Sequence, residues 1–244
     1  MTDVLPSRRL NKRKVAAVCL LAPLFLFLVY QVALFIMVCW YTVQNPRSTA
    51  FMRQTLNELQ ASENHTADIT YQWVDYDTIS NHLKRAVIAS EDSNFMNHGG
   101  IEWDAIRQAL EYNRKQASQG SAKRRGGSTI TQQLAKNLFL SQSRSYFRKG
   151  QELILTYMIE FVMPKERILE LYLNIAQWGE TTFGAQAAAR HYFKTNAGQL
   201  SARQAANLAA MLPNPSFYDK NRSTRYLNSR TATIQQRMRQ VTIP

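Results

Sequence analysis

An uncharged apolar segment near the N-terminus is the feature that most restricts how this chain can fold. No charged residue occurs from Val15 to Pro46, and the segment includes VAAVCLLAPLFLFLVYQVALFIMVCW. This run exceeds the roughly 20 apolar residues that a helix needs to cross a bilayer. A buried core helix would show a polar face over this length. A cleaved signal peptide would have a shorter apolar region followed by small residues. We therefore predict a transmembrane helix over residues 15–41.

The charges before this segment predict its orientation. Five basic residues precede it: Arg8, Arg9, Lys12, Arg13 and Lys14. Positive flanks stay on the cytoplasmic side, and Trp40 and Tyr41 suit the aromatic belt of the opposite interface. Residues 1–14 are therefore expected to form a cytoplasmic basic tail, with everything after about residue 45 outside the cytoplasm.

The remaining composition points to an anionic partner and away from a structural metal. The formal net charge of +13 suits anionic lipid headgroups or phosphorylated substrates. The predicted side of the membrane argues against nucleic acid. Both cysteines, Cys19 and Cys39, lie in the apolar segment, and the four histidines lack the spacing of a helical zinc site. We therefore predict no structural metal site.

Beyond the anchor, a 3.6-residue apolar period predicts a mainly α-helical domain. Residues 42–75 are interpreted as a stem and residues 76–244 as the catalytic domain. No convincing alternating strands and no internal repeat occur. Helices are expected over 83–93, 102–117, 128–138, 145–162, 165–174, 183–193 and 201–212.

The segment ASEDSNFMNHGGI contains a candidate catalytic carboxylate. Glu91, Phe95 and His98 are spaced i, i+4 and i+7, so they would share one face if the segment were helical. Glu91 follows the apolar run AVIA, and partial desolvation makes a carboxylate a better base near neutral pH. For this segment alone, a surface Glu-Asp pair is the commoner explanation.

Two further segments carry polar residues suited to a phosphate group. In GGSTITQQLAKNLFL, two glycines before Ser128 and Thr129 predict a turn and a capped helix start. Helix-start amides with a nearby lysine suit phosphate. Downstream, Arg148 and Glu152 are spaced for an ordinary helix salt bridge of about 0.3–0.5 kcal/mol.

In this order, the segments resemble the motifs of the peptidoglycan glycosyltransferase family, which includes the glycosyltransferase domains of bifunctional penicillin-binding proteins. The resemblance covers about residues 70–240 and leaves no room for a transpeptidase domain, as in monofunctional members. It is carried by EDxxFxxHxG at 91–100, GGSTITQQ at 126–133, RKxxE at 148–152, KxxILExYLN at 165–174 and GxxxAAxxYF at 184–193.

The resemblance implies a lysozyme-like, two-lobed helical domain with a hydrophobic membrane-facing edge, behind one transmembrane helix. It implies that lipid II is polymerised into β-1,4-linked glycan, with inversion and release of undecaprenyl pyrophosphate. The setting would be the bacterial inner membrane, with a periplasmic catalytic domain. Other cell-wall synthesis and division proteins are candidate partners.

The resemblance also implies residue roles. Glu91 would be the general base, supported by Asp92, and Glu152 would organise the basic residues or a divalent cation, Mg²⁺ or Mn²⁺; no cofactor would be obligatory. Where many members carry a basic residue, this chain has Gln108, next to Arg107. The implied substrate contacts are Phe95, Ser128, Gln132, Gln133, Lys136, Arg144, Arg148 and Lys149.

Two other functions compete with this one. A membrane-bound muramidase or lytic transglycosylase on a similar fold would cut glycan and would not need the basic cluster of Lys136, Arg144, Arg148 and Lys149. A non-catalytic membrane protein that scaffolds anionic partners would not need Glu91.

Overall fold

The structure is a computed structural model of the chain, and it confirms a mainly α-helical protein. The side chains of residues 12–18 and 20 lie outside the description. The structure describes residues 12–62, 66–121, 124–141 and 145–244.

The predicted helices after residue 80 are confirmed to within a few residues at each end. The helices, in chain order, are α1 (Lys12–Trp40), α2 (Ala50–Ala61), α3 (Asn81–Glu91), α4 (Trp103–Ser118), α5 (Ile130–Phe139), α6 (Tyr146–Val162), α7 (Lys165–Ile175), α8 (Ala185–Phe193), α9 (Ala202–Met211), α10 (Pro215–Lys220) and α11 (Arg225–Arg237). Short 3₁₀ turns occupy Tyr76–Thr78, Phe95–Asn97 and Ala197–Gln199.

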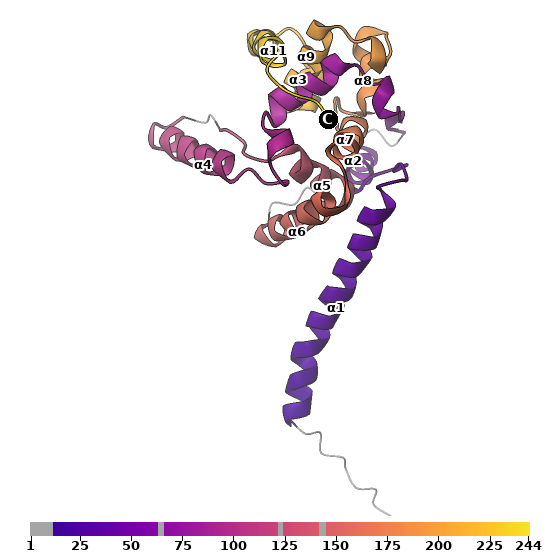
Figure 1. Cartoon of the computed structure of the whole chain (residues 1–244), viewed down its shortest axis with the longest axis vertical. Coiled ribbons are helices and arrows are strands. Elements are labelled where there is room, and N and C mark those ends of the chain that lie inside the picture. The colour runs from indigo at the N-terminus through magenta and orange to yellow at the C-terminus, as the bar shows by residue number, and fades with distance from the viewer. Residues whose placement is uncertain (1–11, 63–65, 122–123, 142–144) are drawn as a thin grey trace, which may run out of the picture.

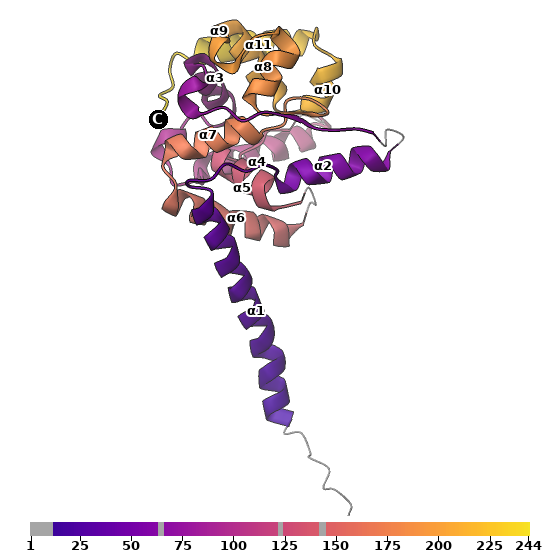
Figure 2. The same cartoon turned by 90° about the vertical axis from the view of Figure 1, so that its right-hand side faces the viewer.

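Helix α1 extends away from the folded domain (Figures 1 and 2). Its segment Leu21–Trp40 has a mean hydropathy of 2.4 and is long and apolar enough to cross a membrane. Only 17% of the most apolar window is buried, so α1 is not a core helix. One face near its C-terminal end is buried, where α1 packs on α6. The chain thus has one N-terminal helix suited to anchor it.

The helices beyond the anchor form a lysozyme-like domain with two groups of helices. In the first, α3, α9 and α11 pack on one another, with α8 and α10 nearby (Figures 1 and 2). In the second, α5 packs on α2, α6 and α7, and α4 projects outward. Helix α7, with Ile168, Leu169 and Leu171 fully buried, contacts both α5 and α8 and so joins the two groups.

The range 42–75, interpreted as a stem, contains two elements that pack on the domain. Thr49 caps α2, whose Met52 is buried, and α2 packs on α5. Strand β1 (Thr70–Tyr71) pairs in parallel with β2 (Thr182–Phe183). This strand pair was not expected, because two residues are too few to show an alternating pattern.

Helices α10 and α11 were also missed. In α11 only a narrow stripe of Leu227, Thr231 and Ile234 is buried, at spacings of four and three residues, among polar and charged neighbours. A stripe this narrow gives a weak periodic signal. Packing on α9 and α3 stabilises α11 instead.

Candidate active site

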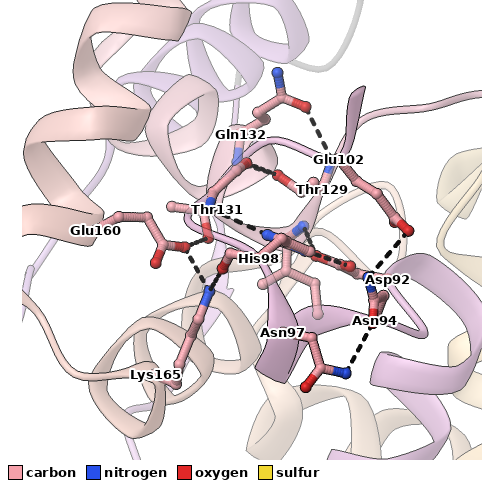
Figure 3. A network of polar contacts seen from close by, with 12 residues as sticks. Asp92, Asn94, Asn97, His98, Glu102, Thr129, Thr131, Gln132, Glu160 and Lys165 are labelled. Carbon is pink, nitrogen blue, oxygen red and sulfur yellow. Dashed lines mark hydrogen bonds and ion pairs between the residues drawn. The ribbon is translucent and has the colours of Figure 1, made fainter. Parts of the chain in front are cut away.

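Two sequence-distant motifs meet at the buried carboxylate of Asp92 (Figure 3). Its Oδ2 accepts a hydrogen bond of 3.0 Å from the backbone N–H of Ile130, at the start of α5. Its Oδ1 lies 2.8 Å from Nε2 of His98. A carboxylate at a helix N-terminus is favourable because the first amides have no partner within the helix. Asp92 therefore fixes α5 against the end of α3.

His98 and Gly100 complete this connection. The backbone N–H of Gly100 donates to Nδ1 of His98 at 3.1 Å, so Nε2 carries the ring proton and donates to Asp92. Thr129 donates from its hydroxyl to the carbonyl of Gly100 at 2.5 Å. Gly100 has φ of +89°, and a Cβ there would lie 2.7 Å from Glu160 and Thr156. Only glycine fits this position.

The segment from Glu91 to His98 is not one α-helix, so the condition under which Glu91, Phe95 and His98 would share a face is not met. Helix α3 ends at Glu91, and Asp92 leaves the helical conformation with φ of −160°. Phe95 is fully buried and lies under the ammonium of Lys165, 4.6 Å from the ring centroid. From this buried position Phe95 supports the site through its contact with Lys165.

Lys165 ties the same region to α6. Its ammonium donates to the carbonyl of His98 at 2.7 Å and to Glu160 at 2.8 Å (Figure 3). The other partner of Glu160 is the hydroxyl of Thr131, at 2.5 Å. Helices α5, α6 and α7 are thereby joined behind the site by charge-assisted hydrogen bonds.

The carboxylate of Glu91 stands at the junction of the two helix groups and is partly buried. Its Oε2 accepts from the side-chain amide of Gln133 at 3.0 Å, and its Oε1 accepts from the hydroxyl of Ser90 at 3.0 Å. A carboxylate offers about four lone-pair positions, so each oxygen keeps one for a further proton. Glu91 is held in place and can still act as a base.

Tyr172 supports this arrangement from α7. Its hydroxyl donates to Oε1 of Gln133 at 3.0 Å, which turns the amide N–H of Gln133 toward Glu91. Burial, with the nearby charges of Glu91 and Asp92, raises the pKa of Tyr172 well above its usual value of 10.0. Tyr172 therefore keeps its proton and remains a donor.

A second polar group gathers at the start of α6. Glu152 is 3% exposed and forms ion pairs with both Arg148, at 2.7 Å, and Lys149. Arg148 keeps a buried Nε with no partner among the described residues. Lys149 is exposed and reaches the hydroxyl of Ser128 at 3.5 Å. Glu152 thus holds two cations beside Ser128, the residue before the N-cap of α5.

Lys136 lies on α5, three residues after Gln133. Burial lowers the pKa of its ammonium below the usual 10.5. Glu152 and, more weakly, Glu91 oppose this shift, whereas Arg148 and Lys149 reinforce it. The chain around the start of α5 also contacts both polar groups, since Gln133 donates to Glu91 and Ser128 accepts from Lys149 at 3.5 Å.

Other predicted site residues are placed differently. Gln132 is 1% exposed, and its side chain caps α5 by accepting from the N–H of Thr129 at 3.0 Å. Arg144 lies outside the described residues. Arg107 and Gln108 are exposed on α4, where Arg107 lies 3.8 Å from Asp104. Among the described residues, Gln133 contacts Glu91 directly, and Arg148 and Lys149 are paired with Glu152, with Lys149 reaching the start of α5 at Ser128.

Asp92, His98 and Glu152 already have partners for the atoms that could bind a metal. One potential ligand atom from each of Asp92, His98 and Glu102 lies within 4.8 Å of the others. Both ring nitrogens of His98 and both oxygens of Asp92 already make hydrogen bonds. The two oxygens of Glu152 are each paired with a cation. A metal would have to displace these partners.

We did not predict from the sequence that Ser90 and Tyr172 contribute to the site. Tyr172 lies inside KxxILExYLN, and a tyrosine at a core position of an apolar helix needs a partner for its hydroxyl. That signal could have marked Tyr172, but not its partner. Ser90 gives no sequence signal beyond its position next to Glu91.

Comparisons with known proteins cover most of this chain. A family model described as transglycosylase matches residues 56–239. A biosynthetic peptidoglycan transglycosylase of Bordetella pertussis is 62% identical over 238 residues, covering 98% of both chains. Proteins of the same description from Herminiimonas arsenicoxydans and Methylobacillus flagellatus are 54% and 50% identical, covering 95% and 92% of this chain and 98% and 96% of theirs.

Proposed function

The chain belongs to the transglycosylase family and is a glycosyltransferase that acts on peptidoglycan, and we propose that it polymerises lipid II into β-1,4-linked glycan strands. In the proposed reaction, the 4-hydroxyl of the GlcNAc in one lipid-linked disaccharide attacks the anomeric carbon at the lipid-pyrophosphate end of the growing strand. The bond from that carbon to the pyrophosphate oxygen breaks, and undecaprenyl pyrophosphate leaves with the electron pair.

Glu91 is the proposed general base. It takes the proton of the attacking hydroxyl on one of the lone pairs left free by Gln133 and Ser90. One base is enough, because a pyrophosphate leaves without needing a proton donor. A glycosidase differs in this respect, since its leaving group must usually be protonated by a second carboxyl group.

Lys136, Arg148 and Lys149 are the proposed ligands of the donor pyrophosphate. They stabilise the negative charge that grows on the leaving group. Glu152 keeps the two α6 cations in place, and Ser128 and Gln133 are proposed to contact the substrate. Arg144, which lies outside the described residues, is also a proposed ligand of the pyrophosphate. Because each oxygen of Glu152 is already paired with a cation of the protein, no step is assigned to a divalent cation.

The proposed setting is the bacterial inner membrane, with the N-terminus in the cytoplasm and the catalytic domain in the periplasm. Helix α6 packs beside the membrane anchor α1. Its exposed aromatic residues would contact the bilayer where a lipid-linked substrate is found; they are Tyr146, Phe147, Tyr157 and Phe161. Other cell-wall synthesis and division proteins are proposed partners.

One observation carries this proposal: the start of α5 contacts both polar groups, since Gln133 donates to the candidate base Glu91 and Ser128 accepts from Lys149 of the cation cluster at Glu152. A base beside a phosphate-binding cluster suits transfer from a pyrophosphate. A scaffold would need no base, and a muramidase would need no cations.

The test supplies the purified full-length protein with labelled lipid II in detergent. We expect a polymer that muramidase digests. Glu91→Gln should lose about 10²–10⁴-fold in turnover, the usual contribution of a general base. Wild-type turnover by Glu91→Gln would remove Glu91 from the mechanism.

The same preparation is then offered finished, uncharged glycan. Degradation of this glycan by the wild type, with no polymer made from lipid II, would replace the synthetic function with a muramidase. If neither substrate reacts, the scaffold function is favoured. Full turnover in the presence of EDTA is expected, because the protein carboxylates do not fit an obligatory metal.

A further inference from the structure

A side chain far along the sequence reaches the residue next to the proposed base. Arg230 lies on α11, and its Nη2 is 3.1 Å from the hydroxyl oxygen of Ser90 and 3.5 Å from the Ser90 carbonyl. Ser90 is in the last turn of α3, directly before Glu91. None of the sequence motifs includes Arg230.

The chemistry of the three groups fixes the direction of these hydrogen bonds. A guanidinium has only donors, so the hydroxyl oxygen of Ser90 must accept from Arg230. The single hydroxyl proton of Ser90 can then go to Oε1 of Glu91, at 3.0 Å, or to the carbonyl of Ala209, at 3.3 Å. The contact with the carboxylate is shorter and charge-assisted, which favours it.

The arginine makes the serine a better donor. A hydroxyl that accepts a hydrogen bond from a cation donates its own proton more strongly, because hydrogen-bond chains polarise one another. The guanidinium also stands at the C-terminal end of α3, where unpaired carbonyls and the helix dipole favour a positive charge. Arg230 is partly buried, and its Nε is buried without a partner among the described residues, so the guanidinium is not simply in solvent.

We propose that Arg230 is a positioning residue that orients the carboxylate of Glu91 through the hydroxyl of Ser90. The inference rests on the proposed role of Glu91 as the base. Gln133 holds Oε2 from the α5 side, and Ser90 with Arg230 holds Oε1 from the α11 side. The carboxylate is thus fixed from both helix groups, with its remaining lone pairs facing the acceptor hydroxyl.

The proposal predicts that substitutions of Arg230 and of Ser90 do not affect activity independently. Without Arg230, the serine hydroxyl can turn to Ala209 and leave Oε1 of Glu91 unheld. Without the serine hydroxyl, the arginine has nothing through which to act. We therefore expect Arg230→Gln and Ser90→Ala each to lower kcat about tenfold, the usual effect of one charge-assisted hydrogen bond, with KM for lipid II changed less than about twofold.

The decisive measurement is a double-mutant cycle for polymerisation of labelled lipid II by the full-length enzyme. If Arg230 acts through Ser90, the double variant should be no slower than the slower single variant. Arg230→Lys keeps a cationic donor and should recover part of kcat. Arg237→Gln, an exposed arginine on the same helix, is the matched control and should behave as wild type.

Several results would overturn the inference. Multiplying losses in the double variant would mean that Arg230 acts independently of Ser90. Wild-type kcat for Ser90→Ala, which keeps the α11 contact surface intact, would exclude the serine link even if Arg230→Gln folds poorly. A rise in KM without a fall in kcat would point to substrate binding. If Glu91→Gln is active, both the base role of Glu91 and this inference are wrong. If Glu91→Gln is inactive and both Arg230→Gln and Ser90→Ala match the wild type, only this inference is wrong.

Discussion

Replacing Lys136 with methionine should lower activity without weakening the fold. Burial of the Lys136 ammonium lowers its pKa, which means that the folded protein holds the charged form at a cost in stability. Glu152 and Glu91 each keep two other partners when Lys136 is removed. Lys136→Met therefore leaves no buried carboxylate unpaired, and methionine fills a similar volume. The thermal midpoint should equal or exceed that of the wild type.

The effect on catalysis should be large. Charge-assisted contacts to phosphate contribute about 1.5–3 kcal/mol each, which corresponds to a loss of about 10- to 100-fold in turnover of lipid II. Polymerisation is followed with labelled lipid II, and the thermal midpoint by circular dichroism in the same detergent. Lys115→Met, an exposed lysine on α4, is the control and should change neither quantity.

The pH dependence provides an independent check. Between the lowered pKa of Lys136 and its unfolded value of about 10.5, the unfolded chain binds more protons than the folded one. The contribution of Lys136 to stability therefore rises with pH in this window. The stability advantage of Lys136→Met should shrink as pH approaches 10.5. A variant that melts several degrees below wild type yet keeps full turnover would show that Lys136 is structural, and would refute the reasoning.

Three further predictions concern the anchor and the fold. Intact-mass measurement of the protein from membranes should retain residues 1–14, and a soluble form beginning near residue 45 as the main species would contradict an uncleaved anchor. Gln31 of α1 and Gln151 of α6 form two buried hydrogen bonds with each other, of 2.7 and 3.0 Å. Gln31→Leu should lower the free energy of unfolding by about 1–2 kcal/mol, because it leaves Gln151 unpaired. Adding Gln151→Leu should recover most of this loss in a thermal melt. Gly184 has φ of +83° and no room for a Cβ beside the Asn174 carbonyl, so Gly184→Ala should cost at least about 2 kcal/mol. Gly150→Ala, in open space on α6, should instead gain about 0.5–1 kcal/mol, and equal effects of the two substitutions would contradict the strain at Gly184.

The sequence by itself determined the features that depend on local composition and periodicity. The uncharged run after Lys14 predicts the anchor, because crossing a bilayer requires only a long enough apolar helix. The 3.6-residue period and the Thr129 cap predict α5 within two residues of its observed start. The order and spacing of the motifs indicate the family, because each motif is contiguous in the chain.

Only the tertiary structure decided which polar groups meet. Glu91 contacts Gln133, which is 42 positions away, and Ser90 meets Arg230 across 140 positions. No periodic pattern encodes such pairs, because they depend on how α3, α5, α7 and α11 pack. Burial is likewise a property of packing: Phe95 and Gln132, two of the implied substrate contacts, are buried, and Lys136 is desolvated. A residue's type can be read from the chain, but its solvent exposure and its hydrogen-bond partners exist only after the helices have assembled.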